Sequence, residues 1–377
     1  MKILKSSALI KPPAKSANPK IQETPKISKG LEKLLGDTEK KFGKNAIMLG
    51  FPKDEDGQLK VIERVPTGSI SLDIALGGGL PLGRFTELSG AYSVSKTTQA
   101  MHIIRNAQKM GLRCAIIEAE AGSISEPYLR DLGVDVANLV YSPSEGLEEA
   151  LQILFDLQRS GEVQLAVWDS IEASPPTKEY DTDMDDTVQM GIKPKLNNMY
   201  FRKFMAGNNY LTRRDMRPFT LIGINQLREA IGRYGDPEFT TGGRGKGFTA
   251  AIDLRLRKGD WIVEGKGENA QIVGQIVKFK VEKNKTFKRM QTGEFDFYFA
   301  PNSQGVKPLY NDNVKEIIVE GIEYGLIIQG GAWFTVNETG KKFQGLPALV
   351  EYLRPQKNLI DKFRKEIIDQ ITKETSK

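Results

Sequence analysis

The chain alternates between short runs of apolar residues and segments in which apolar residues recur every three or four positions. The runs at 85–89, 113–120, 164–170 and 219–226 are typical of buried β-strands. Helical spacing places one set of residues inward in two segments: Ala100, Ile103, Ile104 and Ala107 in 97–110, and Leu147, Leu151 and Leu154 in 146–157. Buried strands separated by amphipathic helices predict an α/β fold, with a mainly parallel twisted sheet covered on both faces.

The pattern changes in the second half of the chain. Apolar and polar residues alternate at 252–257 and 276–282, which predicts antiparallel β-strands. Helical spacing returns at 314–325 and 358–372, and a hairpin is expected at 337–340 between them. This last region is expected to form a small C-terminal α+β domain.

These patterns divide the chain into four parts. We expect a disordered basic arm at 1–28, an amphipathic helix with a linker at 29–66, an α/β core at 67–304, and the small domain at 305–377. The arm is read either as a basic tether for nucleic acid or a partner, or as a solubilising tail.

Charge and composition exclude several classes of protein. Residues 1–29 hold seven lysines and one glutamate, which accounts for the whole formal charge of +6, so bulk charge does not argue for DNA binding by the folded part. One cysteine, Cys114, and one histidine, His102, exclude a disulfide framework and a zinc site of Cys and His, and fit a reducing cytoplasm. The sequence contains no apolar run of about 18 residues, so we expect neither a membrane anchor nor a signal peptide.

The stretch SGAYSVSKTTQA, residues 89–100, is close to the phosphate-binding pattern G-x-x-x-x-G-K-[ST]. Gly90, Lys96 and Thr97 occupy their places, while Ser95 replaces the second glycine. Lysine supplies a charge to the phosphates, the threonine hydroxyl ligates Mg²⁺, and backbone N–H groups close around the phosphates. The nucleotide-binding residues predicted here are Gly90, Ser93, Ser95, Lys96, Thr97 and Thr98. Taken alone, the stretch could also be a serine-rich turn before a helix.

A left-handed conformation at Ser95 would cost about 1–2 kcal/mol, and we expect the loop still to work. If all of that strain appears on binding, Ser95→Gly should bind ATP about five- to thirtyfold more tightly. If the loop has shifted instead, the Ser95 hydroxyl could donate to a phosphate and the glycine variant would bind more weakly.

Polar side chains stand where the predicted strands end. Asp169 follows an apolar strand as a Walker B acid does, and Glu120 is placed to activate an attacking water. The carboxyl ends of parallel strands share one edge of a sheet, so the end residues should gather there: Glu118, Glu120, Asp169, Asn225 and Gln226. Singly, an acid at such a position is often a helix cap or a solvated loop residue.

Several longer blocks resemble the RecA recombinases, in the same order and at similar spacing. They are GSISLDIALGGGLPLGRFTELSG (68–90), DLGVD (131–135), INQLREAIGRYGDPEFTTGG (224–243), VEKNK (281–285) and EGIEYGLIIQGGAWF (320–334). The resemblance runs from about residue 29 to about residue 373. The serine-containing loop and AGSISEPYLR (121–130) are more similar to bacteriophage members, the UvsX type, and the C-terminus lacks the long acidic tail of many bacterial members.

The resemblance implies roles for individual residues. Lys96 and Thr97 would bind phosphate and Mg²⁺, and Glu120 would be the catalytic carboxylate. Gln226 would sense the γ-phosphate. The remaining assignments are Asp169 as the Walker B acid, Tyr128 near the adenine, and Lys283 with Lys285 reaching into the ATP site of a neighbouring subunit.

The resemblance also implies two DNA-binding loops, at 178–191 and 227–246. The first is acidic, and its matching residue is Met190. In the second, Ile231 resembles an apolar wedge between bases, and the basic candidates are Arg228, Arg233, Arg244 and Lys246. Without the resemblance, both segments would be read as surface loops.

The resemblance implies an ATP- and Mg²⁺-dependent recombinase that forms filaments on single-stranded DNA and exchanges it with double-stranded DNA in recombination and repair. Expected partners are DNA, further copies of the chain, and a single-strand-binding protein and a loader protein. Two alternatives stay open: an ATP-binding DNA filament protein with little hydrolysis, and a ring helicase with the same core.

Overall fold

The computed structural model describes residues 27–52, 61–183, 191–229, 238–240 and 244–375. The chain divides into two compact units, with the boundary between Pro52 and Lys53. In the first unit, helix α1 (Lys29–Phe42) begins after Ser28, whose side chain accepts a hydrogen bond from the Leu31 N–H at 3.2 Å. No residue of α1 is buried, and Leu34 and Phe42 are exposed.

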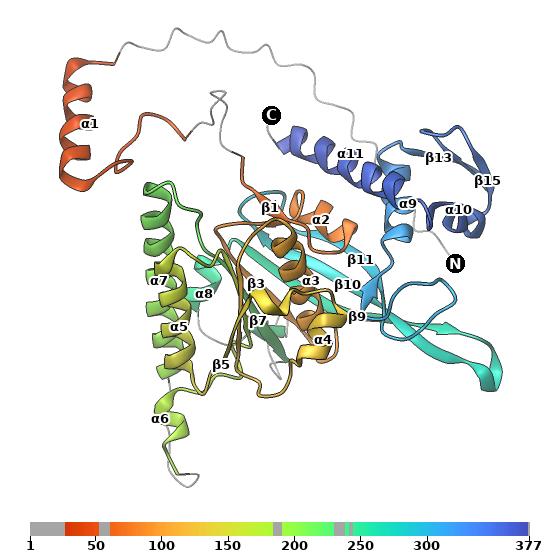
Figure 1. The fold of residues 1–377 in the computed structure, drawn as a ribbon, viewed down its shortest axis with the longest axis horizontal. Coiled ribbons are helices and arrows are strands. Elements are labelled where there is room, and N and C mark those ends of the chain that lie inside the picture. Colours follow the sequence, from red (N-terminus) through yellow and green to blue (C-terminus); the bar gives the residue numbers. More distant parts are fainter. Residues whose placement is uncertain (1–26, 53–60, 184–190, 230–237, 241–243, 376–377) are drawn as a thin grey trace. The chain divides into compact units, whose positions relative to one another are not determined.

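The second unit is built on one large mixed sheet (Figure 1). Its order is β12-β11-β10-β9-β3-β7-β6-β4-β5, and β8 pairs with β7. The pairs from β9 through β3, β7, β6 and β4 to β5 are parallel, and those from β9 to β12 are antiparallel. The parallel strands are β3 (Phe85–Gly90), β4 (Cys114–Glu118), β5 (Leu139–Pro143), β6 (Leu165–Asp169), β7 (Thr220–Glu229) and β9 (Ile252–Glu264). The other strands are β8 (Glu238–Thr240), β10 (Gln271–Asn284), β11 (Gln291–Tyr298) and β12 (Tyr310–Asn311).

Helices cover both faces of this sheet, as the apolar spacing predicts (Figure 1). One core lies beneath α2 (Ile70–Leu76), α3 (Lys96–Lys109) and α4 (Glu126–Asp131). The opposite core lies beneath α5 (Leu147–Ser160) and α7 (Ile192–Arg213). The inward residues predicted for 97–110 and 146–157 are all buried, so the α/β prediction is confirmed.

Two features differ from the sequence-based expectation. The long helix α7 was not predicted, although Tyr200, Phe204 and Leu211 recur at helical spacing and are buried. Strand β9 was expected to be antiparallel, but it pairs in parallel with β3 and antiparallel with β10. It therefore joins the two halves of the sheet, because each edge of a strand can pair independently.

The C-terminal elements have a core of their own, which also includes Ile70 of α2. They are α9 (Asn313–Glu323), β13 (Ile327–Gly330), β14 (Trp333–Val336), β15 (Lys342–Gln344), α10 (Leu346–Leu353) and α11 (Lys357–Thr375). The expected hairpin connects β14 and β15. The four-part domain division stays a prediction.

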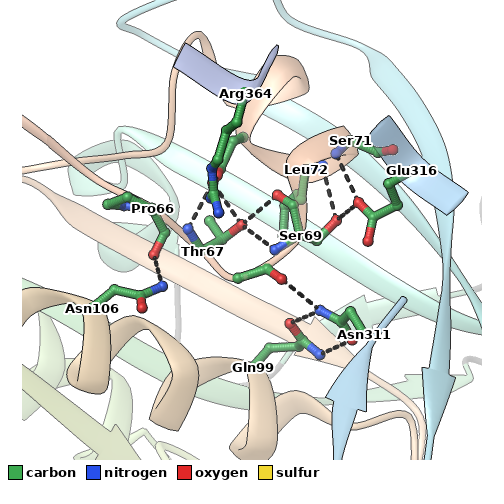
Figure 2. A network of polar contacts seen from close by, with 12 residues as sticks. Pro66, Thr67, Ser69, Ser71, Leu72, Gln99, Asn106, Asn311, Glu316 and Arg364 are labelled. Atoms are coloured by element: carbon green, nitrogen blue, oxygen red, sulfur yellow. Dashed lines mark hydrogen bonds and ion pairs between the residues drawn. The ribbon is translucent and has the colours of Figure 1, made fainter. Parts of the chain in front are cut away.

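A polar network joins these C-terminal elements to α2 and α3 (Figure 2). Glu316 of α9 accepts from the Ser69 hydroxyl at 2.6 Å and from the Ser71 N–H at 2.9 Å. Arg364 of α11 pairs with Asp73, and Asn311 donates to the carbonyl of Gly68 at 3.3 Å. The segment before and within α2 is thus held by α9 and α11 and by Asn311 of β12. Within the described ranges, no helix is long and apolar enough to cross a membrane.

Candidate nucleotide site

The phosphate-loop candidate connects strand β3 to helix α3 at the carboxyl edge of the sheet. Gly90 ends β3 where a Cβ atom would lie 2.6 Å from the Leu256 carbonyl oxygen and 2.8 Å from Val94, so only glycine fits there. Val94 is buried and anchors the middle of the loop. The turn therefore delivers the chain to the N-terminus of α3, where backbone N–H groups favour an anion.

Two serines in this loop have left-handed backbone conformations. Ser93 has φ 53°, and Ser95, the N-cap of α3, has φ 61° and ψ 23°. The Ser95 hydroxyl donates to the carbonyl of Val94 at 2.6 Å and does not cap the helix. Ser95 thus adopts the conformation for which the pattern calls for glycine, and its side chain does not take the place of a backbone donor.

Lys96 and Thr97 lie at the first positions of α3. The Lys96 ammonium donates to the carbonyl oxygens of Gly90 at 3.0 Å and Ala91 at 2.7 Å. Burial lowers the pKa of Lys96, while Asp169 and Glu120 act in the opposite direction. The Thr97 hydroxyl donates to Asp169 at 2.7 Å, which brings the predicted phosphate and metal residues together.

Asp169 ends strand β6 and is almost fully buried. Burial raises its pKa to about 6, and the hydrogen bond from Thr97 opposes this shift. Asp169 and Thr97 offer carboxylate and hydroxyl oxygens, which are the ligand types that Mg²⁺ prefers when phosphates and water supply the rest. This donor set fits a shared magnesium ion. The described residues contain no group of three or more acids, histidines or cysteines that could hold a metal alone.

Glu120 follows the neighbouring strand β4 and faces the same edge. Its carboxylate accepts from the Ser170 hydroxyl at 2.8 Å and from the side-chain amide of Gln226 at 3.5 Å. Ser170, which the sequence analysis did not single out, orients this carboxylate. The structure therefore places Glu120 and Gln226 side by side, while their roles in catalysis and γ-phosphate sensing stay predictions.

A cleft of about 460 Å³ opens beside the phosphate loop. The loop and the start of α3 form one wall, and the aromatic residues Trp261, Phe297 and Phe299 contribute to the other. The rings of Trp261 and Phe299 meet edge to face, 6.4 Å apart, and are 52% and 39% exposed. These rings could stack on a base, and the sequence analysis missed them because they lie far along the chain from the loop.

Tyr128, the residue predicted to lie near the adenine, packs partly against the core beneath α3. Its hydroxyl is 2.8 Å from that of Thr98, and burial raises its pKa. Tyr128 is not among the residues that line the cleft. Its contact with the base stays a prediction.

Lys283 and Lys285 lie at the end of β10 and contact α8 (Arg244–Thr249) of the same chain. The Lys283 ammonium donates to the carbonyl of Gly247, and that of Lys285 donates to the carbonyl of Phe248 at 2.7 Å. Within one chain, therefore, the two lysines hold the end of α8. Their action on a neighbouring ATP site stays a prediction.

Lys246 is placed differently from the sequence-based expectation. It was expected to be a cation of the second DNA loop, but it is 3% exposed and forms an ion pair with the buried Glu87. The physical reason is that α8 turns this side chain towards the sheet, where Glu87 compensates its charge.

The other predicted DNA-binding residues cannot be placed by their side chains. Met190, Ile231 and Arg233 lie outside the described residues. Arg228 lies within β7 and Arg244 begins α8, and only their backbone is described. Strand β7 continues to Glu229 and pairs antiparallel with β8.

The family model and the sequence relatives both identify one family. The model of the RecA N-terminal domain matches residues 29–306. Protein RecA of Chlorobaculum tepidum is 37% identical, over 91% of this chain and 93% of that protein. Protein RecA of Chloroherpeton thalassium is 38% identical, over 91% and 90%. A crystal structure of the RadB recombinase is similar with a TM-score of 0.45 and 18% identity, over 62% of this chain and 96% of that one.

Proposed function

Because the chain belongs to the RecA family, we propose that it is an ATP-dependent recombinase that acts in homologous recombination and repair. It is a DNA-dependent ATPase that assembles on single-stranded DNA and exchanges it with a homologous duplex. One observation carries the proposal: Lys96, Thr97, Asp169, Glu120 and Gln226 meet at one edge of the sheet in a chain of this family.

The residues of this edge divide the work of ATP hydrolysis. The N-terminus of α3 and Lys96 hold the phosphates, and Lys96 exchanges its loop carbonyls for phosphate oxygens. Thr97 and Asp169 would hold Mg²⁺, which neutralises phosphate charge when it is bound. Glu120, held by Ser170, orients and deprotonates the attacking water.

Gln226 connects this chemistry to DNA. Its amide contacts Glu120, and strand β7 continues from it into the second DNA loop. A shift of Gln226 towards the γ-phosphate would therefore move the root of that loop. Met190, Arg228, Ile231, Arg233 and Arg244 are proposed as the DNA contacts, and Lys246 is not among them.

We further propose how the chain assembles and where it acts. Copies would form a helical filament in the cytoplasm, with Lys283 and Lys285 completing the ATP site of the next subunit. A single-strand-binding protein and a loader would assist. Ser95 in the phosphate loop and the segment AGSISEPYLR (121–130) support a bacteriophage, UvsX-like type, in which case the compartment is the host cytoplasm.

Strand exchange tests the proposed function. Purified chain, ATP and Mg²⁺ are incubated with circular single-stranded DNA and a linear duplex that is homologous or unrelated. We expect joint molecules only with the homologous duplex, and none from a Lys96→Ala variant. Unwinding of duplexes irrespective of homology would favour the ring helicase, and DNA binding without joint molecules would favour the filament protein with little hydrolysis.

A further inference from the structure

A cluster of polar side chains is buried between α8 and the sheet, apart from the nucleotide cleft. The Lys246 and Glu87 side chains, each 3% exposed, form an ion pair. The side-chain amide of Asn225, which is fully buried, donates to the same Glu87 carboxylate at 3.0 Å. We call Glu87, Asn225 and Lys246 the α8 cluster.

Stability alone does not account for a charged pair in this place. Removing two charges from water is costly, and apolar residues of similar volume usually serve a core equally well or better. On the same face of the sheet, Phe85 on β3 and Leu221 on β7 are apolar and buried. Asp253 on β9, the register partner of Glu87, is a third charged group that interacts with both Glu87 and Lys246. The pair therefore needs another reason to be there, and its position in the chain offers one.

Each member of the α8 cluster belongs to a different functional segment. Glu87 lies on β3, three residues before Gly90, where the phosphate loop begins. Asn225 directly precedes Gln226 and accepts a hydrogen bond from its N–H at 2.9 Å. Lys246 lies on α8, whose first residues end the second DNA loop (227–246) and whose other end is held by Lys283 and Lys285.

We propose that the α8 cluster positions Gln226 and the phosphate loop according to the state of the second DNA loop. This rests on the proposed function. A movement of α8 on DNA binding displaces the Lys246 ammonium, and Glu87 and Asn225 must follow, because separating the partners of a buried ion pair is strongly destabilising. Glu87 and Asn225 act through their neighbours and are positioning residues.

Three variants of the full chain test this inference: Lys246→Met, Glu87→Gln, and the double variant Glu87→Gln/Lys246→Met. The double variant keeps the volumes and removes both charges of the buried pair. Asp253 then loses its repulsion from Glu87 together with its attraction to Lys246, so the double variant should unfold at a temperature close to that of the natural chain. ATP hydrolysis is measured with and without saturating poly(dT). We expect the ratio of the two rates to fall by about fivefold or more in the double variant, within the usual range of coupling between sites.

Affinity for poly(dT) separates this inference from a direct contact with DNA. In fluorescence anisotropy at several salt concentrations, Lys246→Met should bind poly(dT) with the same affinity and the same salt dependence as the natural chain. A weaker affinity with a salt slope reduced by about 1 would make Lys246 a phosphate contact and overturn the inference.

Stimulation of the double variant equal to that of the natural chain would also overturn the inference, while leaving the proposed function intact. If the natural chain itself were not stimulated by poly(dT), the proposed function would fall, and the inference with it. Lys246→Met gives a second sample for the same comparison.

Discussion

The strain at Ser95 should act on the stability of the fold and leave the affinity for ATP nearly unchanged. The left-handed conformation of Ser95 is fixed by contacts inside the chain. The preceding residue, Val94, is buried, and the Ser95 carbonyl accepts the helical hydrogen bond from the Gln99 N–H at 2.9 Å. The cost of this conformation is therefore included in folding. The structure thus argues against the expectation that the strain appears on binding.

Glycine at position 95 has one stabilising and two destabilising effects. It removes a strain of about 1–2 kcal/mol, because it adopts the left-handed region freely. It gives the unfolded chain more freedom, which costs about 0.4–1 kcal/mol, and it loses the hydrogen bond to the Val94 carbonyl, which contributes about 0.5–1.5 kcal/mol. These effects nearly cancel in Ser95→Gly, which should shift the dissociation constant of ATP less than about twofold.

Ser95→Ala is the matched control, because it keeps the Cβ atom and the strain. It also loses the hydrogen bond to the Val94 carbonyl, which contributes about 0.5–1.5 kcal/mol. Both variants lack the hydroxyl, so the glycine variant should be more stable than the alanine variant by the strain less the unfolded-state cost, which is about 0–1.6 kcal/mol, measured by urea unfolding. Titration with a fluorescent ATP analogue gives the affinities. ATP binding that is five- to thirtyfold tighter in Ser95→Gly than in the natural chain would refute this reasoning.

Three further predictions concern other parts of the chain. Burial raises the pKa of Glu316 to about 8, so the folded state holds a proton that the unfolded state releases. The free energy of unfolding should therefore fall as pH rises from about 4.5 to about 8, by at most about 1.4 kcal/mol per pH unit. Glu316→Gln should remove this slope in urea unfolding, and parallel pH profiles of the two proteins would contradict the prediction. ATP should quench the fluorescence of Trp261, so the quenching should persist in Trp333→Phe and be lost in Trp261→Phe. If the Trp261 ring stacks on the base, Trp261→Ala should weaken ATP binding by about fivefold or more. Gln226→Ala should bind ATP nearly as the natural chain does but lose stimulation by single-stranded DNA, and normal stimulation would show that its amide does not connect the two sites.

The sequence predicted the parts of the fold in which local pattern and burial agree. Strands β3, β4, β6 and β7 are short apolar runs, and α3 and α5 have one apolar face, so each could be recognised without its neighbours. The sequence singled out Glu120 and Asp169 because they stand at the ends of predicted strands, and Thr97 because it belongs to a motif with fixed spacing.

Features that depend on distant partners were not predictable in this way. A lysine in a glycine-rich segment reads as a surface cation, and the partner that buries Lys246 is Glu87, 159 positions earlier in the chain. From the sequence, Trp261 can be interpreted only as a strand residue. Its place in the cleft depends on the sheet order, which brings the end of β9 towards the phosphate loop. The parallel pairing of β9 with β3 is likewise a property of the whole sheet.

ATP hydrolysis in response to DNA tests the central claim most directly. The full chain is assayed with ATP and Mg²⁺ over increasing concentrations of single-stranded DNA, beside Lys96→Ala prepared in the same way. Our account predicts a rate that rises to a plateau with DNA in the natural chain, and no turnover in Lys96→Ala at any DNA concentration, because no other described ammonium donates to the loop carbonyls of Gly90 and Ala91. A rate that does not respond to DNA, or one that survives the loss of Lys96, would contradict it.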